Sequence, residues 1–205
     1  MWIKICGLTT PEAVSAALAM RVDALGFVFA ASPRRVTPEF AARLAQPARG
    51  RARCVAVTLH PVQAEIDELL RVFAPDVLQG DLTELAGLRL PAGLERMPVV
   101  RGPNAAPAAL PRRILFEGAV SGSGVTADWA AAAVLARRTE LVLAGGLDSR
   151  NVGAAIGAVS PFGVDVSSGV EERRGVKSPA AITEFVLAAR AATGAPARTG
   201  KEDRR

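Results

Sequence analysis

The 205-residue sequence contains no tyrosine, one histidine and two cysteines, and aromatic residues are scarce. With His60 as the sole histidine, a zinc site built from several histidines is excluded, and a Ser-His-Asp triad would have to use His60 itself. His60 follows an expected strand and precedes Pro61, so we interpret it as a turn residue. Cys6 and Cys54 do not make a disulfide framework and lack the CxxC spacing of a metal site. No metal ion is therefore expected.

Long apolar runs are also missing, although half of the residues are hydrophobic. The longest runs fall well short of the ~20 residues that a membrane-spanning helix requires. The start of the chain lacks the layout of a signal peptide, because Lys4 interrupts the apolar segment and Gly7 ends it. We therefore expect a cytoplasmic protein without a membrane partner.

The net charge of +5 raises the question of nucleic acid binding. Arginine provides 22 of the 25 cationic residues, in an alanine-rich and lysine-poor chain. This composition indicates a coding bias more than a binding surface, and the arginines are scattered along the sequence. Few aromatic side chains are present to stack on bases. No nucleic-acid partner is expected.

Apolar segments with strand character alternate with helical segments along the chain. The expected strands are residues 2–6, 24–29, 54–59, 76–79, 97–100, 113–117, 140–144 and 162–166. The expected helices are residues 11–20, 38–45, 62–72, 127–137, 150–158 and 179–191, with a weak helix near 82–85 and at most two turns in 104–110. Eight strands separated by helices favour a parallel sheet.

Such a sheet is either a closed (βα)8 TIM barrel or an open doubly wound sheet. We favour the barrel because residues of functional character end strand after strand, which places them on one rim. The length is close to the lower limit for this fold, so the loops must be short. We therefore predict a single α/β domain, a (βα)8 barrel over residues 1–192, with a disordered polar tail at 193–205.

Two loops rich in small residues follow the last two expected strands. They contain Gly145 and Gly146, and then Ser167, Ser168 and Gly169. Uncovered backbone N–H groups in front of a helix suit a phosphate dianion, and barrels of this kind bind phosphate after strands seven and eight. The alternative is that these residues serve only tight connections. Their occurrence as a pair favours phosphate binding.

Lys4 and Cys6 share one face of the first strand, while Ile3 and Ile5 share the other. A barrel directs Ile3 and Ile5 toward the helices and turns Lys4 and Cys6 inward. Lys4 would favour the thiolate and lower the pKa of Cys6, which would make Cys6 a usable general base near neutral pH. The alternative is a buried cysteine that acts as a small hydrophobic residue, and Cys54 fits that description.

Three further charged residues are expected at the same rim. Arg34 follows the second strand and could bind a phosphate or carboxylate, or could be a solvated loop residue. Glu117 ends the sixth strand and is a candidate general acid, because partial desolvation would raise its pKa. Asp165 faces inward beside the proposed phosphate loops, where we expect it to hold backbone amides. Lys4, Arg34 and Asp165 are thus our candidate substrate-binding residues.

Five motifs occur in a fixed order between residue 3 and about residue 185. They are KICG at 4–7, GFVF at 26–29 with SPR at 32–34, SGSG at 121–124 with DW at 128–129, LAGGL at 143–147 with NV at 151–152, and GVDVSSGVE at 163–171. Each alone is weak, but the ordered set resembles the phosphoribosylanthranilate isomerase family of tryptophan biosynthesis.

The resemblance implies an Amadori rearrangement of N-(5-phosphoribosyl)anthranilate to 1-(2-carboxyphenylamino)-1-deoxyribulose 5-phosphate, with no cofactor. It implies Cys6 as general base and Arg34 as the contact of the anthranilate carboxylate. The family's general acid is an aspartate, and Glu117 stands at that position. The fourth strand also lacks the family's usual Gln-Leu-His-Gly form, which alters the rim opposite the phosphate.

Two other functions remain open from the sequence. The related isomerase of histidine biosynthesis uses a similar barrel, but it works with carboxylates at both key strand ends, which Cys6 does not fit. A barrel that binds a phosphorylated ligand without catalysis is the other alternative. The sequence does not distinguish a monomer from a homodimer.

Overall fold

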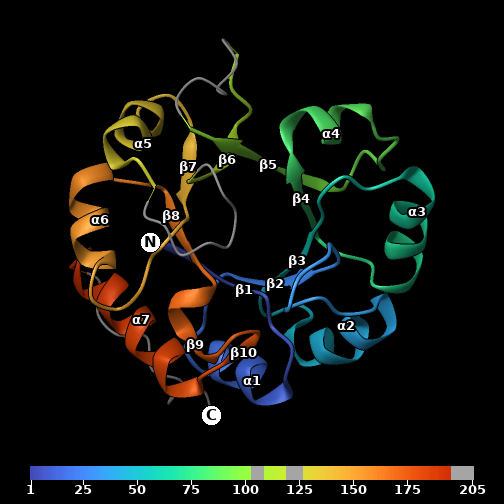
Figure 1. The fold of residues 1–205 in the computed structure, drawn as a ribbon, viewed down its shortest axis with the longest axis horizontal. Helices are drawn as coiled ribbons and strands as arrows, with labels where there is room; N and C mark the ends of the chain where they lie inside the picture. Colours follow the sequence, from blue (N-terminus) through green and yellow to red (C-terminus); the bar gives the residue numbers. More distant parts are fainter. Residues whose placement is uncertain (103–108, 119–126, 195–205) are drawn as a thin grey trace, which may run out of the picture.

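The computed structural model describes residues 1–102, 109–118 and 127–194. Within them, eight parallel strands form a closed barrel in sequential order (Figure 1). The strands are β1 (Trp2–Cys6), β2 (Ala24–Val28), β3 (Arg53–Val57), β4 (Val77–Asp81), β5 (Glu95–Arg101), β6 (Arg113–Glu117), β7 (Glu140–Leu143) and β8 (Gly163–Val166). The predicted (βα)8 TIM barrel is confirmed, and the open sheet is excluded.

Helices follow most of the strands and lie around the outside of the barrel, and between β5 and β6 the described residues contain none (Figure 1). They are α1 (Pro11–Ala19), α2 (Pro38–Ala45), α3 (Gln63–Val72), α4 (Leu82–Gly87), α5 (Trp129–Ala136), α6 (Val152–Val159) and α7 (Pro179–Ala191). The helical turns considered for 104–110 fall mostly outside the described residues, as do positions 195–205 of the predicted tail and the SGSG motif. The disordered tail stays a prediction.

The hydrophobic core has two layers, as the alternation of side chains along a barrel strand requires. Ile3 and Ile5 of β1 belong to the layer between the strands and the helices. The small layer inside the barrel consists of Ala24, Val55, Val77, Met97, Val99, Leu115, Val142 and Ala144. Lys4 faces inward and is fully buried. The predicted orientation of the first strand is therefore confirmed.

A short antiparallel hairpin after β8 was not expected from the sequence. It consists of β9 (Glu171–Arg173) and β10 (Val176–Lys177), joined through Gly175. Gly175 has a φ of +86°, and a Cβ atom there would lie 2.7 Å from the carbonyl oxygen of Pro33. Only glycine allows this approach. The hairpin therefore packs directly on the loop that carries Arg34.

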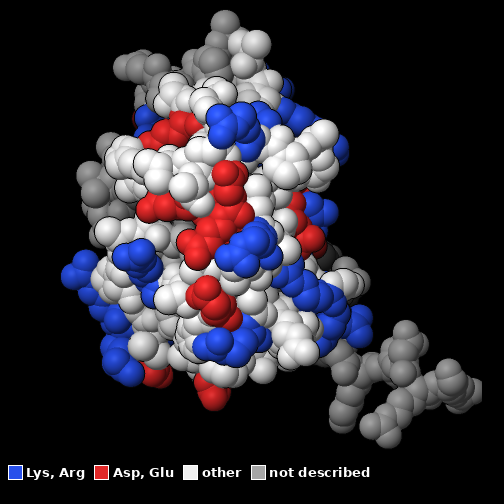
Figure 2. All heavy atoms as spheres, turned by 90° about the vertical axis from the view of Figure 1, so that its right-hand side faces the viewer, with Lys and Arg blue, Asp and Glu red and all other residues white. Residues whose placement is uncertain are grey.

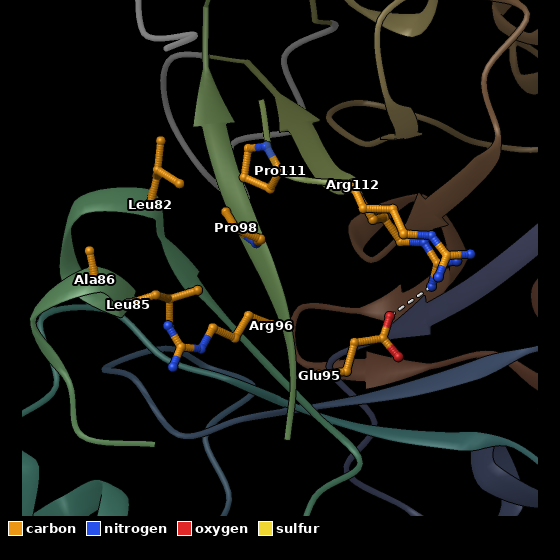
Figure 3. Close-up of a pocket in the computed structure, with 9 residues that line it drawn as sticks. Leu82, Leu85, Ala86, Glu95, Arg96, Pro98, Pro111 and Arg112 are labelled. Carbon is orange, nitrogen blue, oxygen red and sulfur yellow. Dashed lines mark hydrogen bonds and ion pairs between the residues drawn. The ribbon is translucent and has the colours of Figure 1, made fainter. Parts of the chain in front are cut away.

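The outer wall of the barrel is hollowed between α4 and the strands β5 and β6 (Figure 3). The hollow measures about 540 Å³. Met97 and Val99 of β5 point into the barrel. Arg96 and Pro98 alternate with them along the strand, so the side chains of Arg96 and Pro98 face the hollow. The hollow is thus separated from the barrel interior by the strands themselves.

The surface over α3 and α4 carries both signs of charge (Figure 2). Exposed Glu65, Asp67 and Glu68 on α3 stand near exposed Arg71. None of the described helices has the length and apolar character needed to span a membrane.

Candidate functional site

A pocket of about 210 Å³ opens at the carboxyl-terminal ends of the barrel strands. It brings together most of the predicted site residues, namely Cys6, Arg34, Glu117, Gly145, Gly146, Asp165, Ser167 and Ser168. Two predicted residues do not line it. Lys4 is fully buried one inward-facing position before Cys6, and Gly169 lies behind the lining residues of its loop.

Among the described residues, Asp165, which we expected to hold backbone amides, instead forms a buried ion pair with Lys4. They are register partners on β1 and β8, and Lys4 Nζ donates to Asp165 Oδ1 over 2.9 Å. Burial lowers the pKa of Lys4, but its charge interactions with Asp165 and Cys6 outweigh this effect and hold the pKa above its ordinary value. Lys4 is therefore a permanent cation whose charge is largely matched by Asp165.

Cys6 does not have the lowered pKa that the sequence suggested, and that prediction is wrong. Burial raises the pKa of the thiol most strongly, Asp165 adds to the increase, and Lys4 and Lys177 oppose it without reversing it. The sequence placed Lys4 beside Cys6. It did not show how deeply Cys6 is buried, or that Lys4 is paired with Asp165. Cys6 is consequently a thiol in the resting protein and a strong base once it is ionised.

Gly26 on β2 makes room for this pair of side chains. A Cβ atom at Gly26 would lie 2.9 Å from Cys6 Sγ and 3.1 Å from Lys4 Cε. Any larger residue would therefore displace the cysteine from the pocket wall.

Arg34 is held by a partner that sequence reasoning missed. Its Nε and Nη2 donate to the two carboxylate oxygens of Glu171 over 2.6 and 3.1 Å. Burial raises the pKa of Glu171, but hydrogen bonds from Arg34 and Lys177 outweigh it and keep the pKa below its ordinary value. Glu171 therefore fixes one edge of the Arg34 guanidinium while Arg34 lines the pocket.

Lys177 extends this network to the proposed phosphate loop. Its buried Nζ donates to Glu171 Oε1, to Ser167 O and to Ser167 Oγ over 2.8, 2.8 and 3.1 Å. Burial lowers the pKa of Lys177 despite the adjacent Glu171 carboxylate. Neither residue was a candidate from sequence, because the hairpin that carries them is too short to give a strand pattern.

The two proposed phosphate loops touch each other through their backbones. A Cβ atom at Gly169 would lie 2.0 Å from the carbonyl oxygen of Leu147. Gly145 and Gly146 have φ values of +89° and +64°, and Asn151 at the start of α6 donates to Gly146 O over 2.7 Å. After Ser167 the expected helix is a single 3-10 turn, Ser168–Val170. The small residues are thus required both for backbone conformation and for contact between the loops.

Glu117 is paired with Arg101, another residue that the sequence did not single out. Arg101 Nε lies 2.9 Å from Glu117 Oε1, and Arg101 also forms an ion pair with Asp81. Strands β4 and β5 continue to Asp81 and Arg101, beyond the predicted ends at 79 and 100. The extension places both residues at the rim, beside Glu117.

The residues without a predicted role behave as expected. His60 is exposed, has a φ of +50° and pairs with Glu84, so it is a turn residue. Cys54 is buried, and burial raises the pKa of its thiol to about 11. The part of the chain that the structure describes holds no cluster of His, Cys, Asp and Glu able to bind a metal ion.

Comparison with known proteins gives a consistent result. The family described as N-(5'phosphoribosyl)anthranilate (PRA) isomerase matches residues 3–188. The N-(5'-phosphoribosyl)anthranilate isomerase of Mesorhizobium japonicum is 40% identical over 211 residues, covering 93% of this chain and 95% of that protein. The enzyme of Rhizobium etli strain CIAT 652 is 38% identical and covers 89% and 91%.

Solved structures of this family are similar to this chain in sequence and in fold. TrpF from Jonesia denitrificans is 36% identical with a TM-score of 0.79, covering 94% of this chain and 98% of that one. A phosphoribosyl anthranilate isomerase in complex with reduced 1-(o-carboxyphenylamino)-1-deoxyribulose 5-phosphate is 28% identical with a TM-score of 0.74, covering 93% and 99%.

Proposed function

Because this chain belongs to the N-(5'-phosphoribosyl)anthranilate isomerase family, we propose that its pocket rearranges that substrate with Cys6 as general base and Glu117 as general acid. The product is 1-(2-carboxyphenylamino)-1-deoxyribulose 5-phosphate, an intermediate of tryptophan biosynthesis. The observation that carries the proposal is the convergence of Cys6 and Glu117 on one pocket with Arg34 and the two phosphate loops.

The substrate is oriented by its two anionic ends. The phosphate binds to backbone N–H groups of residues 145–146 and 167–169, with Ser167 and Ser168 as hydroxyl donors. The anthranilate carboxylate binds to the guanidinium edge of Arg34 that Glu171 leaves available. Asp165 lines the pocket together with Cys6, and Lys4 supports Asp165 from inside the barrel through their ion pair. Binding at both ends holds the furanose ring between the acid and the base.

Protonated Glu117 donates its proton to the furanose ring oxygen. The bond between that oxygen and C1′ breaks, and the nitrogen lone pair forms a C1′=N iminium. As the iminium forms, Cys6 gives its thiol proton to solvent water. The resulting thiolate takes the C2′ proton, the electrons of the C2′–H bond form the C1′=C2′ double bond of the enolamine, and the C1′=N π electrons return to nitrogen. A proton added at C1′ and the loss of the enol proton give the ketone at C2′. Each placed acid or base typically contributes about 10²–10⁴-fold.

The neighbours of Cys6 suit the second step. A buried thiolate is a stronger base than an exposed one, so it removes a carbon-bound proton effectively once it forms. Lys4 supplies the adjacent positive charge, and the iminium cation of the ring-opened substrate adds a second. Both favour the thiolate at the moment when the base is needed.

The proposal also covers the location and the oligomeric state of the enzyme. We place it in the cytoplasm, as a monomer or homodimer that acts on a free phosphosugar. Among the related structures, that of Thermotoga maritima concerns monomers generated from a dimeric isomerase. Gel filtration with light scattering would distinguish the two states.

The proposal is tested by following the loss of anthranilate fluorescence after purified protein is mixed with freshly generated substrate. We expect turnover in the parent and losses of about 10²–10⁴-fold in Cys6→Ser and Glu117→Gln. Cys54→Ala is the matched control, because Cys54 is buried away from the pocket, and it should retain turnover.

Binding of a reduced product analogue should persist in both variants, because neither residue is proposed to anchor the phosphate. A parent protein that binds the analogue but shows no turnover would instead indicate a binding-only barrel. Full activity in Glu117→Gln would remove Glu117 from the mechanism and leave the isomerase assignment intact.

A further inference from the structure

Three charged side chains form a row along the carboxyl-terminal ends of β4, β5 and β6. Arg101 and Glu117 are register partners on β5 and β6, with 2.9 Å between Arg101 Nε and Glu117 Oε1. Arg101 Nη1 pairs with Asp81, the last residue of β4. One guanidinium therefore bridges two carboxylates, one on each neighbouring strand.

The Asp81 side chain pairs with Arg101 in place of capping the helix that follows it. Asp81 is the N-cap of α4, where an aspartate ordinarily accepts a hydrogen bond from the first helical turn. Its side chain makes no capping hydrogen bond and contacts Arg101 instead. Burial lowers the pKa of Arg101, but the carboxylates of Asp81 and Glu117 outweigh this effect and hold the pKa above its ordinary value. The guanidinium therefore stays charged.

We propose that Arg101 and Asp81 are positioning residues for Glu117: Arg101 fixes the direction of its carboxyl group, and Asp81 offsets the charge of Arg101. The inference rests on the acid role proposed above for Glu117. Neither Arg101 nor Asp81 exchanges a proton with the substrate.

The first part of this role follows from the length of the glutamate side chain. Glutamate has one more rotatable bond than aspartate, so its carboxyl group has more positions available. A displacement of about 1 Å can reduce a rate by on the order of 10²-fold. The bond from Arg101 Nε restricts Glu117 to one direction at the rim.

The second part follows from the requirement that a general acid carry a proton. An arginine paired with a single carboxylate favours the ionised form of that carboxylate, which opposes proton donation. Asp81 places a second negative charge on the same guanidinium. Its charge disfavours ionisation of Glu117 and so partly restores the ability of Glu117 to hold a proton.

The other charged groups around the pocket are largely matched by their own partners. Arg34 is paired with Glu171, and Asp165 is paired with Lys4. Cys6 is a thiol in the resting protein, and the loop after β7 contributes uncharged residues 144–147. Arg101, which lines the pocket with Glu117, and Asp81, which pairs with Arg101, are thus the charges among the described residues that we place in control of Glu117.

The test compares Asp81→Asn and Arg101→Gln with the parent, each also prepared with Glu117→Gln. The infrared difference between each protein and its Glu117→Gln counterpart isolates the carboxyl band of Glu117, which is then titrated with pH. We expect the midpoint to fall in Asp81→Asn and to rise in Arg101→Gln. We also expect kcat to fall about 10- to 100-fold in both, with a smaller change in KM.

Arg112→Gln is the matched control, because Arg112 lies just before β6 at the opposite end of the barrel and pairs with Glu140 at the surface. It should leave the Glu117 midpoint and kcat unchanged. Arg101→Lys provides a second variant should Arg101→Gln fold poorly. Lysine keeps the charge without the fork that reaches both carboxylates, so kcat should fall while the midpoint moves less than in Arg101→Gln.

Midpoints that stay fixed, or that move in the same direction in Asp81→Asn and Arg101→Gln, would overturn the positioning role. If Glu117→Gln still removes turnover in that case, the proposed function survives. If Glu117→Gln retains full turnover, Glu117 is not the acid, and the positioning role is overturned together with it.

Discussion

Lys4 and Asp165 meet where the first and last strands of the barrel join, 2.9 Å apart and shielded from solvent. Removing one member of a buried pair leaves an uncompensated charge, which typically destabilises a protein by about 3–5 kcal/mol. We expect Asp165→Asn to lower the free energy of unfolding by about that amount, measured by urea denaturation. Replacement of both residues, as Lys4→Met with Asp165→Leu, should recover much of the loss.

The control for this experiment is Arg112→Gln, which breaks an ion pair whose arginine is 85% exposed. Exposed pairs contribute about 0–1 kcal/mol, so unfolding should change little. Equal destabilisation by Asp165→Asn and Arg112→Gln would contradict the importance assigned to the buried pair.

The raised pKa of Cys6 predicts a slow alkylation that accelerates with pH. The thiolate is the reactive form, so the rate should rise through a midpoint above the value of about 8.5 found for ordinary thiols. The measurement uses iodoacetamide on Cys54→Ala protein, in which Cys6 is the remaining cysteine. A midpoint below that of a small thiol would mean that Lys4, and not burial, controls the cysteine.

The bidentate contact between Glu171 and Arg34 predicts a binding defect when it is broken. Glu171→Gln removes the charge that fixes Arg34 and leaves buried Lys177 without its carboxylate. We expect KM to rise about tenfold or more, with a smaller change in kcat. Glu172→Gln removes the same charge from an exposed neighbour and should leave both constants unchanged.

The contact between the two phosphate loops predicts that substrate binding is sensitive to substitution of Gly169 and insensitive to substitution of Gly157. Gly169→Ala places a methyl group against the Leu147 carbonyl oxygen and must separate the loops, so we expect KM and the inhibition constant of inorganic phosphate to rise at least tenfold. Gly157→Ala in α6 meets no atom within 4 Å. It should leave kinetics unchanged and raise stability by about 0.4–1 kcal/mol, measured by thermal unfolding.

The sequence predicted the features that depend on local pattern. The alternation in residues 2–6 was sufficient to turn Lys4 and Cys6 inward, and the small residues at 145–146 and 167–169 marked the two loops that the structure joins. The expected strand ends placed Arg34 and Glu117 on the same rim, and both line the pocket.

What the sequence did not predict depends on contacts between distant residues. Gly80 and Asp81 have weak strand character, yet pairing with β5 extends β4 through them, beyond the predicted end at Gln79. Burial reversed the expected direction of the Cys6 pKa, because the number of atoms around a thiol is a property of the closed barrel. The hairpin that carries Glu171 and Lys177 has two to three residues per strand, too few for a periodic signal.

The pairing of β1 with β8 also has a consequence for synthesis on the ribosome. Lys4 is made 161 residues before Asp165, which lies beside Lys4 and Cys6 in the finished barrel and raises the pKa of the Cys6 thiol. Until those residues have been added and the barrel has closed, the cysteine therefore lacks the burial and the carboxylate that suppress its ionisation. An incomplete chain carries a thiol of ordinary reactivity, and closure of the barrel buries that thiol and raises its pKa.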